Sequence, residues 1–526
     1  MIRENIQFTP INFTGGLDLE NSHTQKTPGT LIDCQNFAPR FGGGYALVKG
    51  FERFDGQPAP SGAVDPDTAR AAIQTVPGNG DILGVWMFNG NLYAFRNDAG
   101  DTAAVMHKAT PTGWQVVSTP ALLPGGKYEF ETYNFFASTA SNRMFGVDGV
   151  NPAFMFDGTT FTQLVIPGET YKPIHIAAHS NHLFLAYPQG QWVHSGIGDP
   201  TKWDTATEGA GAGGSGDDIV AMRPTVGGAL AFFMRNKVSV LYGSSQADWQ
   251  ATDMRKQSDQ AGAIEGSIQT AGSDLVYLDD NGLTTMQQSQ NFGNFQSRAL
   301  DKLIHTYLVQ RKNRVLGSLI SHNANQYRLF LRYDSGTEVI TLTFGTQGGI
   351  EGFGRYLYPV KFTCFFQRED ETGQERLFAG AEDGYVYEMD VGGSFDGADI
   401  QAWFKTSYAN CRNDQLRKRF RKALVTIESS GTLPLKIKPY YDYGQNGIPS
   451  GLPAEAETEI TGGHWNIDDW NEFYWAGPDA NQVTVDITGI GRNLSLFFFY
   501  QGKENANLIF RDCVISWAQR GRMKGL

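Results

Sequence analysis

The chain has little cysteine: its 526 residues include four, and no two of them show Cys-x-x-Cys spacing. Cys34, Cys364, Cys411 and Cys513 are far apart in the sequence, which argues against a disulfide framework or a zinc site. We expect reduced thiols, as is usual for a protein made in a cytoplasm. Residues 1–16 contain no apolar segment of the kind found in a secretory signal, so none is predicted.

Long hydrophobic runs and positive charge are also scarce. Leu494–Tyr500 is the densest apolar run late in the chain; it is far too short to span a bilayer and is typical of a strand. Lys and Arg number 43 against 55 Asp and Glu, which gives a formal net charge of −12. That balance argues against a general affinity for nucleic-acid phosphates.

Glycine and aromatic residues are plentiful, with 62 glycines and 13% aromatics. Many turns combined with many aromatics favour an all-β protein built from short strands.

One pattern recurs along the chain: two short apolar runs flank a tight turn, which predicts a β-hairpin. The seven predicted hairpins are Val85–Phe95, Arg143–Phe156, His182–His194, Leu230–Tyr242, Leu275–Met286, Tyr327–Phe344 and Arg376–Asp390. The last five turns follow one another at intervals of 46 to 54 residues. Such a spacing is typical of β-propeller blades, each of which needs its neighbours to bury its apolar face.

The predicted fold class is all-β: a β-propeller with an N-terminal arm and a C-terminal antiparallel β-sandwich-like domain. Six to eight blades are expected, without a WD or kelch signature; the alternative is a β-sandwich or an irregular all-β domain. We place the arm at residues 1–60, the propeller at 61–395 and the C-terminal domain at 396–526. The C-terminal strands could instead close the propeller as its last blade.

One helix is expected inside the propeller, at about residues 298–313. Leu300, Leu303, Ile304, Tyr307 and Leu308 recur at helical spacing and give this segment one apolar face. We expect it to pack across a blade edge, or to reach a neighbouring subunit.

The motifs that could support catalysis are incomplete. The glycine-rich stretch Gly209–Gly216 lacks the Gly-Lys-Ser/Thr ending of a phosphate-binding loop, so a loop facing solvent or a ring axis is expected. His182 and His194 could face each other across a hairpin, but no third metal ligand follows a known spacing. We therefore predict no enzyme activity, no catalytic residue, no cofactor and no metal.

The strongest charge run lies in residues 412–422 of this acidic chain. It contains five cations in six residues, namely Arg417, Lys418, Arg419, Arg421 and Lys422. The run is interpreted either as a solvated strand edge protected from aggregation or as a patch that docks on an acidic surface of a subunit or adaptor. Direct contact with DNA phosphates is a third interpretation.

Several stretches resemble a known family. They are the turn at Thr14–Asp18, the segment Asn36–Arg40 with the glycines that follow it, Lys49–Phe54, and His194–Trp203, which precedes the acidic, glycine-rich loop Glu208–Asp218. Together with the hairpin blades, these stretches resemble the tail nozzle, or packaged-DNA stabilisation, proteins of short-tailed bacteriophages. The resemblance spans most of the chain.

The resemblance implies a virion protein of the phage tail, made in the host bacterial cytoplasm. It implies a homo-oligomeric ring, a hexamer, below the portal and its adaptor. The ring continues the DNA channel, retains packaged DNA and lets it exit on ejection. Its implied partners are the head-to-tail adaptor, tail fibres or tailspikes, and double-stranded DNA that passes without specific binding; no membrane span is expected. Candidate gate or docking loops contain Glu208, Asp217, Asp218, Trp465, Trp470 and Trp475.

Two other functions remain open from the residues alone. A phage propeller could bind or degrade carbohydrate during receptor recognition, with exposed tryptophans as sugar platforms. A monomeric propeller scaffold is the other alternative.

Overall fold

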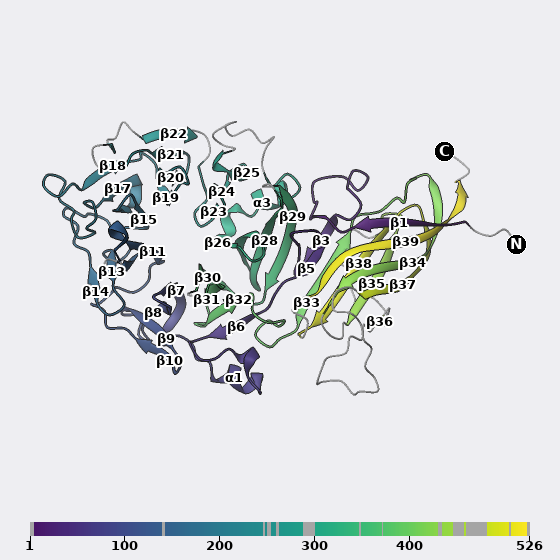
Figure 1. Cartoon of the computed structure of the whole chain (residues 1–526), viewed down its shortest axis with the longest axis horizontal. Coiled ribbons are helices and arrows are strands. Elements are labelled where there is room, and N and C mark those ends of the chain that lie inside the picture. Colours follow the sequence, from purple (N-terminus) through teal and green to yellow (C-terminus); the bar gives the residue numbers. More distant parts are fainter. Residues whose placement is uncertain are drawn as a thin grey trace.

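The computed structural model describes residues 5–138, 142–245, 248–249, 254–258, 262–287, 300–346, 349–370, 372–429, 434–444, 457–458, 481–503 and 507–522. The regular secondary structure of the described chain is almost entirely β-strand, with a few short helices. It forms a propeller from which a smaller β-sandwich extends to one side, so the molecule is elongated (Figure 1).

Within the described residues, the propeller has seven blades, each with three or four antiparallel strands. Given from the strand nearest the axis outward, the first three blades are β7 (Asn79–Phe88), β8 (Asn91–Asn97), β9 (Ala104–Thr110) and β10 (Gly113–Val116); β11 (Glu129–Asn134), β12 (Asn142–Val147), β13 (Phe154–Phe156) and β14 (Phe161–Gln163); and β15 (His175–His179), β16 (His182–Ala186), β17 (Gln191–His194) and β18 (Gly211–Gly214). The other four are β19 (Ile219–Pro224), β20 (Leu230–Met234), β21 (Val238–Leu241) and β22 (Met254–Ser258); β23 (Gln269–Ala271), β24 (Asp274–Asp279) and β25 (Gly282–Thr285); β26 (Val315–Ser321), β27 (Gln326–Tyr333), β28 (Gly336–Phe344) and β29 (Ile350–Tyr358); and β30 (Phe362–Glu369), β31 (Glu375–Ala381), β32 (Val386–Met389) and β6 (Phe51–Phe54).

The seven predicted hairpins are confirmed, one in each blade. Their turns explain why they form: Asn89 and Gly90 both have positive φ (48° and 72°), as a two-residue hairpin turn requires. The blades then bury their apolar faces against one another, and the innermost strand of the last blade, β30, contacts β7 of the first. The ring of blades is therefore closed.

The last blade is completed by a strand from the other end of the chain. β6 pairs with β32 in antiparallel register, with Phe51 opposite Met389 and Phe54 opposite Val386. Phe51 is fully buried, and its ring stacks on Phe395 with centroids 5.1 Å apart. The alternative in which the C-terminal strands close the propeller is therefore wrong, because β6 performs that role.

The C-terminal strands form a sandwich of two sheets, as predicted, but the N-terminal arm supplies strands to both. The first sheet contains β4 (Phe37–Pro39), β5 (Tyr45–Leu47), β39 (Ile509–Arg522), β34 (Leu416–Glu428) and β37 (Asn481–Gly491), with β1 (Ile6–Asn12) paired to β39. The second contains β3 (Leu31–Gln35), β33 (Ile400–Thr406), β38 (Leu494–Gly502), β35 (Leu435–Tyr441) and β36 (Glu457–Thr458). The arm thus pairs within its own chain.

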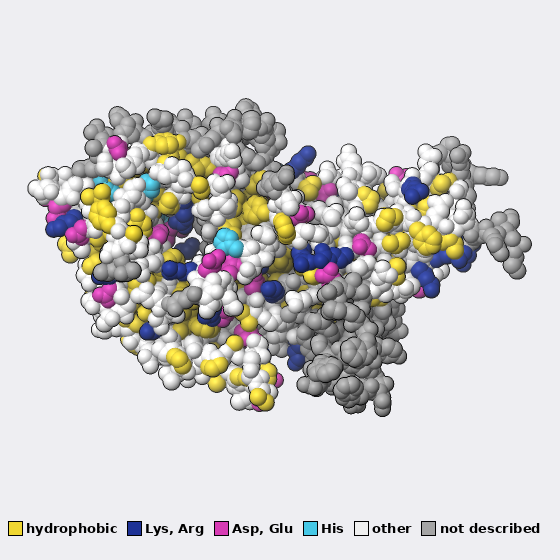
Figure 2. Space-filling view, in the orientation of Figure 1, with side chains coloured by type: hydrophobic (Ala, Val, Ile, Leu, Met, Phe, Trp, Pro, Cys, Tyr) yellow, Lys and Arg dark blue, Asp and Glu magenta, His cyan; other side chains and the backbone are white. Residues whose placement is uncertain are grey.

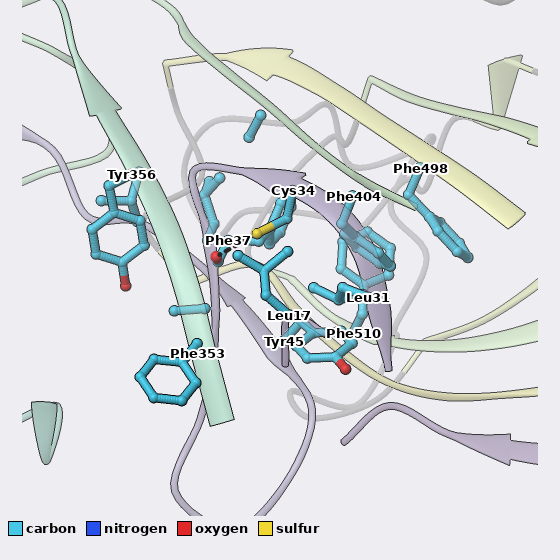
Figure 3. Packing of buried hydrophobic residues seen from close by; sticks show 14 of the residues in the cluster. Leu17, Leu31, Cys34, Phe37, Tyr45, Phe353, Tyr356, Phe404, Phe498 and Phe510 are labelled. Carbon is cyan, nitrogen blue, oxygen red and sulfur yellow. Dashed lines mark hydrogen bonds between the residues drawn. The ribbon is translucent and has the colours of Figure 1, made fainter. Parts of the chain in front are cut away.

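Aromatic side chains fill the space between these two sheets. Phe404 lies 4.6 Å from Phe498, 5.0 Å from Phe37 and 5.0 Å from Phe510, centroid to centroid (Figure 3). All four rings are fully buried. The core that they form joins strands from both ends of the chain.

The sandwich is joined to the propeller through the sixth blade. The outermost strand of that blade, β29, pairs with β4 at Arg355 and Phe37, and with the two-residue strand β2 (Gly15–Gly16) in parallel. One hydrogen-bonded sheet therefore runs from the blade into the sandwich.

The predicted helix is much shorter than expected. Only α3 (His305–Val309) is helical, followed by a 3₁₀ turn at Lys312–Arg314, and residues 298–299 lie outside the described part. Its N-terminal turn is bound by the arm: Glu20 accepts hydrogen bonds from the backbone N and the hydroxyl of Thr306 at 2.6 and 3.1 Å.

A second short helix, α1 (Pro66–Ala72), follows the closing strand. None of the described helices is long and apolar enough to cross a membrane.

Candidate functional site

A charged cavity lies at the propeller axis, where the inner strands of several blades converge. Its volume is about 320 Å³, and Lys127, Glu129, His175, Arg223 and Glu265 are among the residues that line it. In the space-filling view, this part of the propeller is hollowed, with basic and acidic side chains around the opening (Figure 2). Its wall combines charged residues with apolar ones such as Ile174, Leu316 and Phe365.

Glu129 is the centre of this cavity's charge network. Its carboxylate lies 2.7 Å from Nδ1 of His175 and 3.0 Å from Nη1 of Arg223, which come from the third and fourth blades. Burial alone would raise the pKa of Glu129, but its contacts with His175 and Arg223 outweigh that effect and lower the pKa to about 2. Glu129 is therefore held ionised and joins three blades.

Glu131 lies two residues along the same strand and behaves in the opposite way. Burial raises the pKa of Glu131 to about 7, the Glu129 carboxylate adds to the increase, and Arg223 opposes it. A pair of carboxylates with separated pKa values is a feature of acid–base catalysis. Here, however, Glu129 is tied to two cations, and the cavity wall contains Glu129 rather than Glu131.

Glu129, His175 and Arg223 were not predicted as site residues from the sequence. Glu129 lies 46 residues from His175 and 94 from Arg223, so no local motif connects them. Only a correct assignment of each strand to its blade would have shown that Glu129, His175 and Arg223 lie close together.

The glycine-rich stretch is not the loop that we expected. Residues Gly211–Gly214 form β18, the outermost strand of the third blade, and pair with β17. A Cβ atom at Gly213 would lie 2.4 Å from the Trp192 ring, and one at Gly211 would lie 2.3 Å from the His194 ring. Glycine is required because these two rings lie directly against the β18 backbone.

The three acidic residues of this stretch stabilise turns. Asp217 accepts hydrogen bonds from the backbone and side-chain nitrogens of Asn236, and Asp218 accepts one from the backbone of Gln189. Glu208 accepts hydrogen bonds from the backbone nitrogens of Trp203 and Asp204. The other three candidate gate or docking residues, Trp465, Trp470 and Trp475, lie outside the described residues.

The basic run forms the first half of β34 and is divided between two faces of its sheet. Lys418 is fully buried, and its ammonium group donates to the carbonyls of Asn413, Leu416 and Arg492. It therefore does not belong to a surface patch, contrary to our expectation. Arg417 and Lys422 are exposed, while Arg419 and Arg421 are half-buried.

His182 and His194 do face each other across their hairpin, with ring centroids 5.1 Å apart. Both donate from Nδ1 to the same acceptor, the carbonyl of Ser195, at 2.6 and 2.9 Å. Their rings pack against Trp249 at 4.7 and 5.0 Å, and burial lowers the pKa of His194 to about 4. Across the described ranges, no group of three or more His, Cys, Asp or Glu side chains is placed to hold a metal ion.

No protein-family model and no curated protein matches the chain. Among solved structures, the computationally designed Ika8 protein is 11% identical, with a TM-score of 0.36 over 60% of this chain and 98% of its own. YCF48 bound to D1 peptide is 12% identical, with a TM-score of 0.39 over 60% and 94%. BBS1N in complex with ARL6DN is also 12% identical, with a TM-score of 0.39 over 65% and 97%. Likeness at this level says nothing about what the chain does.

Proposed function

We propose that the chain is a structural virion protein of a short-tailed bacteriophage, a tail nozzle that assembles into a ring below the portal adaptor. In the ring, it retains packaged DNA and lets the duplex exit on ejection. The phage assignment depends on the sequence resemblance at Thr14–Asp18, Asn36–Arg40, Lys49–Phe54 and His194–Trp203. The implied hexamer, adaptor, tail fibres or tailspikes and location in the virion tail belong to the same proposal.

Two features of the molecule support this proposal: strand pairing that ties the sandwich to the propeller, and the excess of acidic residues in the propeller. One N-terminal segment adds strands to both sandwich sheets and then closes the propeller, so the two bodies cannot separate without breaking strand pairs. Residues 61–395 contain 34 Asp and Glu against 23 Lys and Arg. A rigid wall of this charge suits a conduit, because a duplex passes most easily where its phosphates are not bound.

The propeller axis is not that conduit. The axial cavity has a volume of about 320 Å³, and the Glu129 network crosses it. A DNA duplex, whose major groove alone is about 12 Å wide, cannot pass through it. The DNA channel of the proposed nozzle would therefore run between several copies of the chain.

A carbohydrate-degrading propeller is the second candidate, because Glu129 and Glu131 have opposite pKa shifts near the axis. A glycosidase needs one carboxylate free to attack or to activate water. Since Glu129 is bound by His175 and Arg223, the structural role is favoured.

Two measurements on the purified full chain separate the proposals. Native mass spectrometry is expected to find a closed oligomer, and incubation with bacterial polysaccharide is expected to release no reducing sugar. A monomer at micromolar concentration would contradict the nozzle. Sugar release that is lost in Glu129→Gln would favour the enzyme instead.

A further inference from the structure

One tryptophan of the fourth blade is inserted among three histidines of the third. The two blades lie side by side in the part of the propeller away from the sandwich (Figure 1). Trp249, which follows β21, is 5% exposed. Its ring centroid lies 4.7 Å from that of His182, 5.0 Å from that of His194 and 6.0 Å from that of His179. We call these four residues the tryptophan joint.

The three histidines are buried among apolar groups. None of His179, His182 and His194 is more than 6% exposed. Phe184 packs against the rings of His179 and His194, and the backbone of Gly211 lies directly against His194. Because a charged ring would lose its hydration in such a site, burial lowers the pKa of each of the three imidazoles. The joint is therefore built from neutral rings.

Two polar atoms of the joint are buried without a hydrogen bond. Nδ1 of His182 donates to the carbonyl of Ser195, and Nε2 of the same ring has no partner. Nε1 of Trp249 is likewise buried and unpaired. A proton added at Nε2 of His182 would carry charge into an apolar site and would find no acceptor there.

Within the described residues, no acidic side chain offsets a charge in the joint. Besides the effect of His182 on the other two rings, no described charged group acts on the pKa of these histidines. The turn that carries Trp249 has one carboxylate, Asp248, which is exposed and bonded within that turn. On the other side, Lys202 and Glu208 pair with each other at 3.1 Å, and β18 consists of glycine and alanine.

We propose that the tryptophan joint is an acid-sensitive contact, which opens below neutral pH and detaches Trp249 from the third blade. Protonation of His182 and His194, whose ring centroids are 5.1 Å apart, would place two like charges beside the indole. The indole would then leave, so that both rings reach water. Trp249 belongs to no strand, and its backbone N donates to Ser245 in the same turn, so it can leave without breaking a strand pair. This device does not depend on the proposed function.

Falling pH favours the open joint because the closed joint binds protons less readily. Burial lowers the pKa of His194 to about 4 in the closed joint, whereas a hydrated histidine has a pKa of about 6.5. The stability of the closed joint is therefore fully present above pH 6.5 and is lost as the pH falls towards 4. At pH 4.5, ionisation of His194 alone should raise the equilibrium constant for opening by more than about tenfold.

Hydrogen–deuterium exchange of the full chain tests the opening. It is measured by mass spectrometry at pH 7.0 and 4.5 and corrected for the intrinsic effect of pH on exchange. Peptides from residues 238–249 are expected to exchange at least about tenfold faster at pH 4.5, while peptides from the sixth blade, residues 315–358, keep their protection. Unchanged protection of residues 238–249, or an equal loss in both regions, would overturn the proposal.

Histidine variants identify the groups that cause the opening. His182→Gln combined with His194→Gln removes two ionisable rings, and exchange in residues 238–249 should then be nearly the same at both pH values. His107→Gln is the matched control, because His107 is a buried histidine, 2% exposed, on β9 of the first blade. That variant should open as the wild type does. An acid response that persists in the double variant would contradict the role of these two rings.

A second measurement does not depend on how well the histidine variants fold. The emission of Trp249 is obtained as the difference between the spectra of the wild type and Trp249→Phe, which retains an aromatic ring in the joint. Quenching of this emission by acrylamide is expected to rise as the pH falls, with a midpoint between pH 6.5 and 4. Constant quenching across this range would show that Trp249 stays buried and that the proposal is wrong.

Discussion

Arg53 and Asp396 form an ion pair with Nε and Oδ2 2.7 Å apart, although 343 residues separate them in the chain. Arg53 lies on the closing strand β6, and Asp396 follows the last blade. Asp396 also lies 3.3 Å from Nε of Arg70 on α1. One largely buried carboxylate therefore fixes the N-terminal segment to the junction between propeller and sandwich.

The closing strand is expected to contribute strongly to stability. Phe51→Ala removes a fully buried ring that contacts Phe395 and Tyr387 at 5.1 and 5.2 Å. The cavity left behind should lower the free energy of unfolding by about 3–5 kcal/mol. Chemical denaturation measures this, with Phe41→Ala, at a ring that is 44% exposed, as a control that should change stability little.

Neighbouring glycines on β18 allow a matched test of ring packing. Gly213→Ala would place a methyl group 2.4 Å from the Trp192 ring, whereas no atom lies within 4 Å of the corresponding position at Gly214. We expect Gly213→Ala to lower the melting temperature, with a cost of about 1–3 kcal/mol from overpacking. Gly214→Ala should leave it unchanged or raise it; equal effects of both substitutions would contradict this packing.

Glu131 is expected to make the folded protein less stable as the pH rises. Burial raises its pKa from 4.5 to about 7, so the folded state retains a proton that the unfolded state has lost. The contribution of Glu131 to the free energy of unfolding is therefore fully present below pH 4.5 and is lost between pH 4.5 and 7. Over this range the free energy of unfolding falls by up to about 3 kcal/mol.

Glu131→Gln removes that dependence. The variant should match wild type at pH 4 and exceed its stability at pH 8 in urea denaturation at both values. Glu265→Gln, at a carboxylate of the same cavity whose side chain is 58% exposed, is the matched amide control. Parallel profiles for wild type and Glu131→Gln would show that Glu131 ionises normally.

In the basic run of β34, substitutions at the buried and at the exposed positions should change the free energy of unfolding by different amounts. Lys418→Met leaves the carbonyls of Asn413, Leu416 and Arg492 without their shared donor. We expect a loss of about 1–3 kcal/mol in the free energy of unfolding. Arg417→Met, at the exposed neighbouring position, should change the stability of the monomer by less than about 0.5 kcal/mol. Equal losses would contradict the division of this run between two faces.

The hairpins could be predicted because each depends on a local signal. Asn89-Gly90 between apolar runs specifies a turn and both of its strands within a dozen residues. Closure of the ring by β6 could not be predicted in this way, because Phe51 and Met389 meet through tertiary packing alone. The same limit explains why the arm's strands in the sandwich were not foreseen.

The candidate sites show where residue composition misled the prediction. Glycines in residues 209–216 indicated a loop, but Trp192 and His194 supply the bulk that β18 lacks and make it a strand. Five cations indicated one surface patch, whereas strand alternation turns Lys418 inward. The helical spacing around Tyr307 predicted four turns, but within the described residues 300–313 the α-helix covers only His305–Val309.

Electron micrographs of the purified full chain test the central claim most directly. The account predicts a closed ring of several 57.9 kDa chains around an opening wide enough for a duplex. Single elongated particles, whose only hollow is the axis of one propeller, would contradict it.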